Sequence, residues 1–465
     1  MAASVALQRR SSLASQRSSR RFSSDASSMF VSTEEATLIN DRIDEEIRKE
    51  ASRLKDAKRR EIKVLLLGQA ESGKSTLQKQ FQLFYASKSL DAERHSWIPV
   101  VYFNIIKALR MIFAELDHEI TSQTPNEPLS SSAVRHELND LRIKLLPLLS
   151  LENTLASELS GGVAIAGGRT GAYVRLGWQS LISSTLATSS DTKKSRVENR
   201  TRETTLLVAR TLAVAVDDIE ALWMHESIRF YIQKRKIRLD DSASYFLGHI
   251  QKIAEPEYTP SNDDILNVRL QTLGIMEHSI PIYTGGKTYD WKLYDVGGAR
   301  GQVLASTPSY VPKIVANAYT ESDTLGYRIL MMFLEEDPKT NRIDDSLQLF
   351  STICSNPLLK DAHLVVLLNK ADILREKLDA KTKVRKYITS FGDRPNTFEA
   401  VSDYFRSHFI QVYRRKGASP GRPLYVHFSS MLVRIRHNTT PWIKLKYLYI
   451  KTIGHKSNAK HHIGR

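Results

Sequence analysis

The sequence predicts an α/β protein with a mostly parallel sheet and an inserted all-helical domain. Two patterns in the chain of 465 residues predict this class. Short, largely apolar runs recur along it, as is typical of strands covered on both faces, and helical periodicity lies between several of them. By contrast, the long stretch from Phe84 to Pro260 contains helical patterns but no comparable strand pattern. This stretch is therefore expected to interrupt an α/β domain after its first strand.

The individual elements follow from these patterns in chain order. The five strand candidates are Val64–Leu67, Trp291–Tyr294, Ile329–Phe333, Leu364–Leu368 and Leu424–Phe428, with a weaker one at Ile275–Ile282. The helices expected between the strands include Asp344–Cys354 and Phe398–Val412, and those of the insertion include Trp97–Leu116 and Val208–Ile232. Within the insertion, residues 160–202 are rich in Gly, Ser and Thr, which predicts a flexible loop.

Both ends of the chain are basic, and the body between them is almost balanced. Residues 1–24 contain five Arg and no acid, and residues 433–465 contain eight Lys or Arg and no acid, so these tails carry most of the net charge of +16. A balanced body lacks the basic face of nucleic-acid-binding proteins, and no nucleic-acid partner is expected. No run approaches the roughly 18 apolar residues that span a membrane. The single cysteine, Cys354, fits a reducing compartment.

The N-terminal region divides into an arm and a helix. Residues 1–32 are rich in Ser, Arg and Ala, which predicts a disordered basic arm, although the lack of acids before Asp25 also fits a mitochondrial transit peptide. Residues 33–60 begin with Thr33, Glu34 and Glu35 and then carry apolar residues at helical spacing. This pattern predicts a capped, exposed amphipathic helix.

A phosphate-binding loop is predicted directly after the first strand. The residues from Gly68 to Ser75 read GQAESGKS, which matches G-x-x-x-x-G-K-[ST] between a strand and a helix. Glycines let backbone N–H groups approach phosphate oxygens, and the following helix presents its positive end. Lys74 is expected to reach the β- and γ-phosphates, and Ser75 to bind Mg²⁺. The expected phosphate contacts are Gly68, Glu71, Ser72, Gly73, Lys74, Ser75 and Thr76.

Two further motifs indicate which nucleotide is bound. Asn369–Lys370–Ala371–Asp372 follows a buried strand candidate, and the Asp372 carboxylate can accept both the N1–H and the N2 amino hydrogens of guanine. After another strand, Asp295 can hold a Mg²⁺-bound water and the Gly298 N–H can meet the γ-phosphate. Each motif alone also fits an ordinary turn or polar loop. Their order behind the phosphate loop favours a guanine nucleotide site over a P-loop ATPase, which leaves Asp372 unexplained.

With these motifs the chain resembles the heterotrimeric G-protein α subunit family, most closely its fungal members, over roughly residues 33–300 and 329–430. The resemblance implies a Ras-like P-loop GTPase domain at 61–85 and 262–432 and an inserted helical domain at 86–261. It also implies catalysis by Arg269, an arginine finger in cis, together with Lys74. The resemblance further implies that Thr272 binds Mg²⁺ together with Ser75 and Asp295. The further nucleotide contacts that it implies are Asp241, Ser242, Leu266, Asn369, Lys370 and Met431.

The sequence departs from this family at two positions beside the γ-phosphate. Ala299 stands where the family carries the Gln that orients the attacking water, and Ala70 replaces a Gly of the phosphate loop. Alanine has no group that can orient water, so GTP hydrolysis is expected to be slow. The leading prediction is a signalling switch that binds GTP or GDP with Mg²⁺ and couples a receptor to effectors. The alternatives are a non-cycling, nucleotide-locked scaffold and a non-functional divergent product.

The family's partner surfaces are altered as well. The resemblance implies a βγ dimer and a G protein-coupled receptor as partners, but residues 301–327 and 433–465 are unlike the family, as expected for retained introns or a divergent gene copy. Pro308 and Pro312 disfavour a regular helix in the first segment. Residue 2 is Ala2, so no N-myristoylation site is present. The expected location is the cytoplasm, with peripheral contact at the inner face of the plasma membrane.

Overall fold

The chain divides into two units, Met1–Arg60 and Glu61–Arg465, and each is described by itself. The computed structural model describes residues 33–68, 72–122, 128–160, 172–174, 178, 192–234, 237, 239, 241–272, 275–284, 286–296, 314–320, 333–334, 337–360, 362–386, 388–416 and 422–430. The basic arm expected at 1–32 and the tail at 433–465 lie outside these residues.

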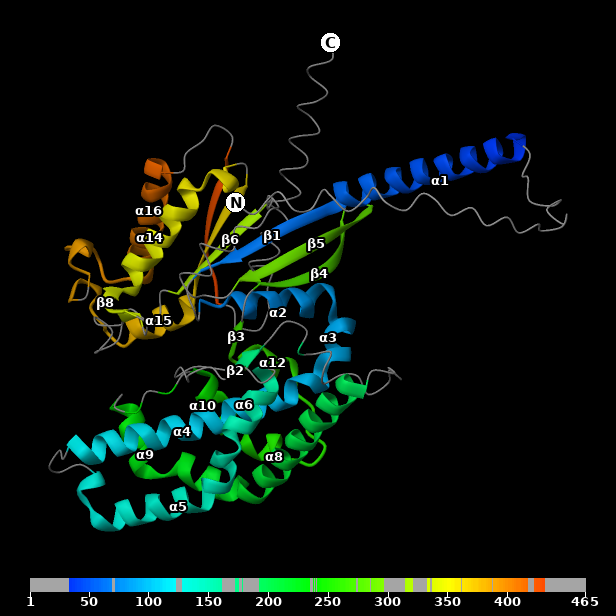
Figure 1. Ribbon diagram of the computed structural model, residues 1–465. Coiled ribbons are helices and arrows are strands. Elements are labelled where there is room, and N and C mark those ends of the chain that lie inside the picture. Colours follow the sequence, from blue (N-terminus) through cyan, green and yellow to red (C-terminus); the bar gives the residue numbers. More distant parts are fainter. Residues whose placement is uncertain are drawn as a thin grey trace, which may run out of the picture. The chain divides into compact units, whose positions relative to one another are not determined.

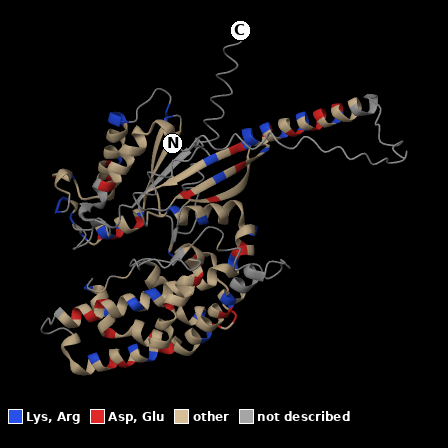
Figure 2. Ribbon diagram, viewed as in Figure 1, with Lys and Arg blue, Asp and Glu red and all other residues tan. Residues whose placement is uncertain are grey.

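The first unit contains one long helix, α1 (Thr33–Arg60), over the residues for which the sequence predicts a helix. Figure 1 labels this helix, and Figure 2 shows both acidic and basic residues along it. One i,i+4 ion pair joins Lys49 to Glu45 at 2.7 Å. The apolar side chains of α1 are exposed within the unit, and they are Leu38, Ile39, Ile43, Ile47 and Leu54.

The second unit is built on a six-stranded sheet with the strand order β10-β9-β6-β1-β5-β4 (Figure 1). Its strands are β1 (Glu61–Leu67), β4 (Ile275–Thr284), β5 (Lys287–Val296), β6 (Ile314–Thr320), β9 (His363–Asn369) and β10 (Leu424–Phe428). Four of the five neighbouring pairs are parallel, and only β4 and β5 run antiparallel. The sheet is therefore mostly parallel, as the sequence predicts.

One strand prediction is contradicted at the single residue of it that the structure describes. The sequence assigns a place in the sheet to Ile329–Phe333, but the position between β1 and β9 is filled by β6. Residues 329–332 lie outside the described chain, and Phe333 belongs to β7 (Phe333–Leu334), which pairs with β8 (Asp337–Asn341) in a separate two-stranded sheet. β6 takes this position because its backbone pairs with a strand on each side. Ile314 lies opposite Val64 of β1 and opposite His363 of β9. A single-sequence hydropathy pattern does not record such pairing.

Helices cover both faces of the sheet, because successive side chains of a strand point to opposite faces. On one face Ile62, Val64 and Leu66 of β1 pack with Leu77 and Phe81 of α2 (Lys74–Tyr85). On the other face, Leu65 and Leu67 of β1 join the apolar side chains of three helices. These helices are α14 (Arg342–Ser355), α15 (Ala371–Asp379) and α16 (Phe398–Lys416).

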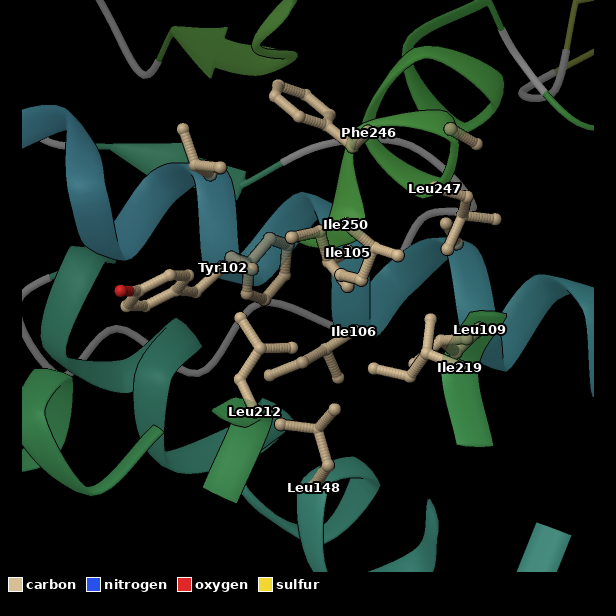
Figure 3. Close-up of a cluster of buried hydrophobic side chains, with 14 of the residues drawn as sticks. Tyr102, Ile105, Ile106, Leu109, Leu148, Leu212, Ile219, Phe246, Leu247 and Ile250 are labelled. Carbon is tan, nitrogen blue, oxygen red and sulfur yellow. The ribbon is translucent and has the colours of Figure 1, made fainter. Parts of the chain in front are cut away.

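The insertion between β1 and β4 is dominated by helices with a core of their own. Its helices are α3 (Ser87–Glu93), α4 (Ile98–Ser122), α5 (Ser132–Ser150), α6 (Glu152–Ser160), α8 (Thr192–Met224), α9 (Glu226–Gln233), α10 (Asp241–Gly248) and α11 (Ile250–Ile253). The short helix α12 (Asn262–Asn267) follows the insertion and leads to β3 (Leu270–Thr272). Figure 3 shows how Ile106 of α4, Leu148 of α5 and Leu212 of α8 meet in this core. The apolar stretch Ser87–Thr121 is long enough to cross a membrane, but 72% of its most apolar window is buried, as in a core helix.

Part of the flexible loop predicted at 160–202 forms regular secondary structure. Thr192–Arg202 forms the start of α8, and Ala172–Val174 forms a short strand, β2, that pairs in parallel with β3 (Leu270–Thr272). Residues 192–202 contain no Gly or Pro, and Thr201 and Arg200 both contact Glu158 of α6, at 3.1 and 2.8 Å. These contacts hold the polar start of α8 in helical form. The remaining residues of the predicted loop lie outside the described chain.

Short 3₁₀ turns complete the described elements. They are η1 (Arg94–Trp97), η2 (Pro128–Ser130), η5 (Pro357–Leu359), η6 (Val384–Lys386) and η7 (Thr389–Phe391). The single helix predicted at Val208–Ile232 is divided at His225, whose side chain caps α9 by accepting a hydrogen bond from the Ser227 N–H at 3.1 Å.

Candidate functional site

The phosphate loop lies at the carboxyl end of β1, where it passes into α2. Gly73 precedes the helix with φ 92°, a left-handed conformation that glycine adopts without a side-chain clash. The Lys74 Nζ donates a hydrogen bond to the Gly68 carbonyl at 2.8 Å, which brings the two ends of the loop together. The Ser72 hydroxyl of this loop is buried and has no hydrogen-bond partner among the described residues. With this geometry the N-terminus of α2 and the Lys74 ammonium both lie at the phosphate loop.

The charge of Lys74 is sensitive to its surroundings. Its side chain is 7% exposed, and desolvation lowers its pKa to about 8, although the nearby Asp295 carboxylate favours the charged form. A group with this pKa is mostly charged at neutral pH and becomes neutral a little above it. A polyphosphate at the loop restores a strong preference for the charged form.

The Ser75 hydroxyl and the Asp295 carboxylate form the candidate Mg²⁺ site. Ser75 Oγ donates to Asp295 Oδ2 at 2.6 Å, which joins the first turn of α2 to the carboxyl end of β5. Asp295 is 2% exposed. In the described part of the chain no three His, Cys, Asp or Glu side chains lie together as a metal cluster. A hydroxyl and one carboxylate fit a hard cation that takes its other ligands from phosphate and water, as Mg²⁺ does.

The second half of the site lies at the ends of β9 and β10. The Asn369 Nδ2 donates to the Ser72 carbonyl at 3.2 Å, so the end of β9 is bonded to the phosphate loop. Ser429 Oγ approaches Asn369 Oδ1 at 3.4 Å from the end of β10. Lys370 then adopts a left-handed conformation with φ 60° and begins α15. The structure therefore brings the two sequence motifs together at the carboxyl edge of the sheet, where ligands bind in open α/β folds.

Asp372 lies in the first turn of α15. Its backbone N–H donates to Ser430 Oγ at 3.1 Å, and the Ala371 N–H donates to the Ser429 carbonyl at 3.1 Å. The Asp372 Oδ1 is buried and has no hydrogen-bond partner among the described residues. A buried acceptor without a donor is costly, and a ligand with N–H groups removes this cost. Met431, the next predicted contact, lies outside the described residues.

The segment that carries Arg269 is anchored to α2. Lys79, which is buried five residues after Lys74, donates to the Ile265 carbonyl at 2.9 Å and to the Val268 carbonyl at 2.8 Å. Burial lowers the pKa of Lys79 to about 7. The helix that begins at the phosphate loop thus also fixes the end of α12, where Leu266 lies, and the residue before Arg269.

The helical insertion contacts the same segment through Asn104 of α4. Asn104 Oδ1 accepts from the Arg269 N–H at 2.9 Å, and Asn104 Nδ2 donates to the Arg269 carbonyl at 3.2 Å. Ser242 Oγ, at the start of α10, donates to Asn104 Oδ1 at 3.3 Å. The next residues form β3, which pairs with β2 of the insertion. Ser242 and Arg269, both predicted from the resemblance, are thus joined through a third residue.

Several predicted positions are not described at the level of side chains. Glu71, Gly298 and Met431 lie outside the described residues, as do Ala70 and Ala299. Thr272 and Asp241 lie in β3 and α10, but only their backbones are described. Thr76 follows Ser75 in the first turn of α2.

Sequence reasoning missed Asn104, Lys79 and Ser430. Asn104 and Lys79 share a signal that was available in the sequence. Asn104 interrupts the apolar run from Val100 to Ile106, and Lys79 lies between Leu77 and Phe81 of an inward-facing helix. A buried polar or charged side chain in such a place requires a specific partner.

The fold and this site define a P-loop nucleotide-binding protein in which a helical insertion separates the phosphate loop from the arginine-bearing segment. Comparison with known families identifies the class more closely. The family described as G-protein alpha subunit matches residues 37–436. The chain therefore belongs to the G-protein α subunit family, whose members are GTPases that bind guanine nucleotides and act in signal transduction. A Ras-like GTPase domain with a helical domain is the architecture of this family.

Individual relatives agree with this placement. The chain is 28% identical to the guanine nucleotide-binding protein alpha-4 subunit of Mycosarcoma maydis, with 80% of this chain and 79% of the relative covered. It is 27% identical to the guanine nucleotide-binding protein subunit alpha-13 of Mus musculus, with 83% and 84% covered. It is 25% identical to the guanine nucleotide-binding protein subunit alpha of Emericella nidulans, with 83% and 87% covered. The likeness to fungal and animal α subunits thus extends over most of the chain.

Proposed function

We propose that this chain is a signalling switch that binds GTP or GDP with Mg²⁺ and hydrolyses GTP slowly. The buried Asp372 Oδ1, which has no partner among the described residues, carries the guanine assignment. Guanine offers two N–H donors on the edge that a carboxylate can accept, whereas adenine offers no such pair. Family membership supports the same nucleotide.

The residues proposed to hold Mg²⁺ are Ser75, Asp295 and Thr272. Ser75 and Asp295 lie in hydrogen-bond contact, and both offer the oxygen atoms that this cation prefers. Family membership supports Mg²⁺ as the cation that accompanies the nucleotide. When bound, Mg²⁺ neutralises charge on the β- and γ-phosphate oxygens.

Hydrolysis forms a bond from a water oxygen to the γ-phosphorus and breaks the bond between that phosphorus and the oxygen that leaves with GDP. In our proposal the Lys74 ammonium and the Arg269 guanidinium stabilise the negative charge that develops on the phosphoryl oxygens. The attacking water also has to be held in line. Ala299 has no polar side-chain atom for this purpose, and Ala70 adds a methyl group near the γ-phosphate. We therefore propose that the nucleotide is bound well and turned over slowly.

The proposed partners are a βγ dimer, a G protein-coupled receptor and an effector. Family membership supports the first two in general terms. We propose that the chain acts in the cytoplasm and contacts the inner face of the plasma membrane peripherally. The positive charges of residues 1–24 favour an anionic membrane surface.

The nucleotide assignment is tested by equilibrium binding of a fluorescent, nonhydrolysable GTP analogue in the presence of Mg²⁺. We expect tight binding that excess GDP displaces and excess ATP does not. Omission of Mg²⁺ is expected to weaken binding of the triphosphate, because phosphate charge is then uncompensated. Displacement by ATP would contradict the proposal.

The turnover assignment is tested by single-turnover hydrolysis of bound GTP. We expect Ala299→Gln to raise the rate at least about tenfold, because the amide can hold the attacking water. Ala299→Leu, which adds a side chain of similar size without hydrogen-bonding groups, is the matched control and should leave the rate low. Fast hydrolysis by the parent chain would overturn the proposal of slow turnover. No hydrolysis in either the parent or Ala299→Gln, with intact binding, would favour the nucleotide-locked scaffold.

A further inference from the structure

We propose that Asn104, on helix α4 of the insertion, is a positioning residue that holds the backbone of Arg269 for GTP hydrolysis. This inference rests on the proposed function, because it assumes that Arg269 acts on the γ-phosphate. Asn104 itself is not proposed to touch the nucleotide. Its role is to fix the peptide groups on both sides of the Arg269 Cα.

The contacts form a two-point clamp. Asn104 Oδ1 accepts from the Arg269 N–H at 2.9 Å, and Asn104 Nδ2 donates to the Arg269 carbonyl at 3.2 Å. Two hydrogen bonds from one planar amide restrict rotation as well as translation of the segment that they hold. A single bond would allow the segment to pivot.

The remaining hydrogen-bonding groups of the Asn104 amide have partners as well. Nδ2 also donates to the Val100 carbonyl at 2.8 Å, and Oδ1 also accepts from Ser242 Oγ at 3.3 Å. An amide has two donor hydrogens and two acceptor lone pairs, so all four are used here. The reverse orientation of the amide would place Nδ2 against the Arg269 N–H and Oδ1 against the Val100 carbonyl. The network therefore determines the orientation of the side chain.

Burial makes this clamp specific. Asn104 is 7% exposed, and its neighbours Val101, Ile105 and Ile106 are fully buried in the core of the insertion (Figure 3 labels Ile105 and Ile106). A polar side chain at such a place is costly unless its partners are present. Helix packing alone favours an apolar residue at position 104, so the amide is explained by what it binds.

Neighbouring contacts fix the segment on both sides of the clamp. Lys79 binds the carbonyl of Val268, the residue before Arg269. The residues after Arg269 form β3, which pairs with β2. Asn104, on the helical insertion, therefore contacts Arg269 itself.

The kinetic test compares Asn104→Ala, Arg269→Ala and the double variant in single-turnover hydrolysis of bound GTP. We expect Asn104→Ala to lower the rate about tenfold, in line with the loss of two hydrogen bonds, and to have no further effect when Arg269 is already Ala. A merely structural role would leave the rate of the bound complex unchanged, or would add to the Arg269→Ala loss. Either of these results would overturn the proposal.

Ile105→Val is the matched control. It removes one buried methylene beside Asn104 and leaves every hydrogen bond of the clamp in place. It is expected to lower the melting temperature slightly and to leave the rate of hydrolysis unchanged. A slower rate in this variant would show that any loosening of α4 is sufficient, and would overturn the specific role of Asn104.

A second readout does not depend on activity. Hydrogen exchange at the Arg269 amide, measured in the GDP-bound chain, reports directly on the bond to Asn104. We expect about tenfold faster exchange in Asn104→Ala and near-parental exchange in Asn104→Asp, because a carboxylate oxygen still accepts from that N–H. Unchanged exchange in folded Asn104→Ala would overturn the clamp. Should Asn104→Ala fail to fold, the rate of single-turnover GTP hydrolysis in Asn104→Asp decides, since Asp keeps the acceptor and loses the donor: a hydrolysis rate equal to that of the parent overturns the clamp.

The two proposals fail in different ways. An unchanged rate in Arg269→Ala would contradict the role of Arg269 in the proposed function, and the positioning role would fail with it. A slower rate in Arg269→Ala combined with a parental rate in Asn104→Ala would overturn only the role of Asn104.

Discussion

The two ends of the nucleotide site differ in how their polar groups are satisfied without a ligand. At the phosphate end, Lys74 is bonded to the Gly68 carbonyl and Ser75 to Asp295. At the guanine end, Asp372 Oδ1 is buried and has no partner among the described residues. The charged groups of the phosphate end therefore exchange internal contacts for ligand contacts, whereas the carboxylate of the guanine end gains contacts that it lacked. The buried Ser72 hydroxyl of the phosphate loop also has no partner among the described residues, but it carries no charge.

Because of this difference, we expect the affinity for the nucleotide and the selectivity for its base to come from different ends of the site. Replacing an existing hydrogen bond by a new one yields little net free energy, unless charge is gained as with a polyphosphate. Satisfying an orphaned buried acceptor yields the whole cost of leaving it unpaired. We therefore expect the guanine end to discriminate strongly between bases, and the phosphate end to respond mainly to charge.

The largest expected effect is at the guanine end. Asp372→Asn replaces an acceptor by an amide and should lower GTP affinity at least about 100-fold, because two charge-assisted hydrogen bonds are lost. In the parent, the inosine analogue that lacks the 2-amino group should bind about 10- to 100-fold more weakly than GTP. This gap should largely close in the variant. Competition binding measures both effects.

Asp379→Asn is the matched control for that experiment. It removes the same charge from an exposed position on α15 and should change neither affinity nor base preference. An Asp372→Asn variant that keeps the parental preference for GTP would show that the base is read elsewhere.

The second effect is at the phosphate end and depends on pH. Burial lowers the pKa of Lys74 to about 8 in the nucleotide-free chain, so above this pH the lysine has to take up a proton before it can pair with phosphate. The GTP dissociation constant should be flat below about pH 7 and should rise toward tenfold per pH unit above pH 8.

Lys74→Arg isolates the contribution of this group. An arginine stays charged over the whole range, so the part of the slope that belongs to position 74 should disappear. Identical pH profiles for parent and variant would contradict the assignment.

The smallest effect is expected at Asn369, which joins the two ends. Asn369→Ala removes the bond to the Ser72 carbonyl and should lower the free energy of unfolding by about 1–2 kcal/mol, with a loss of GTP affinity of less than about tenfold. Urea denaturation and the binding assay measure the two quantities. Asn396→Ala loses two bonds of 2.9 Å in a remote loop and should cost similar stability with no change in affinity. Equal effects of both variants on affinity would show that the ends are not coupled through Asn369.

The sheet was predictable where hydropathy alone determines a strand. The apolar runs that became β1, β5 and β9 are buried on both faces, and such burial leaves a clear trace in the sequence. The run that became β10 is as apolar but only half-buried. β6 has a weaker trace, since in its sequence IVANAYT only the first two residues are large aliphatic ones and an Asn stands in the middle. Its position follows from pairing with β1 and β9, which is a long-range property.

The residues of the site also divide into those that the sequence predicts and those that it does not. Gly68, Gly73, Lys74, Ser75, Asn369 and Asp372 lie in contiguous motifs, so their spacing alone predicts their chemistry. Asn104 was not predicted because its partner is a backbone group 165 positions away. Lys79 likewise binds carbonyls 186 and 189 positions away. Backbone partners leave no signature in a sequence motif.

The position of β1 in the middle of the sheet also determines the order in which the protein can fold. Among the described strands β1 leaves the ribosome first, yet its two neighbours are β5 and β6, which follow residues 68–286 and 68–313. The helical insertion is made in the interval, and its helices contact one another, as α5 contacts α8 and α4 contacts α10, so its core can form before β5 and β6 are made. The apolar strand β1 has to wait unpaired meanwhile. A chain of this topology therefore depends on rapid folding of its insertion and on protection of its first strand during synthesis.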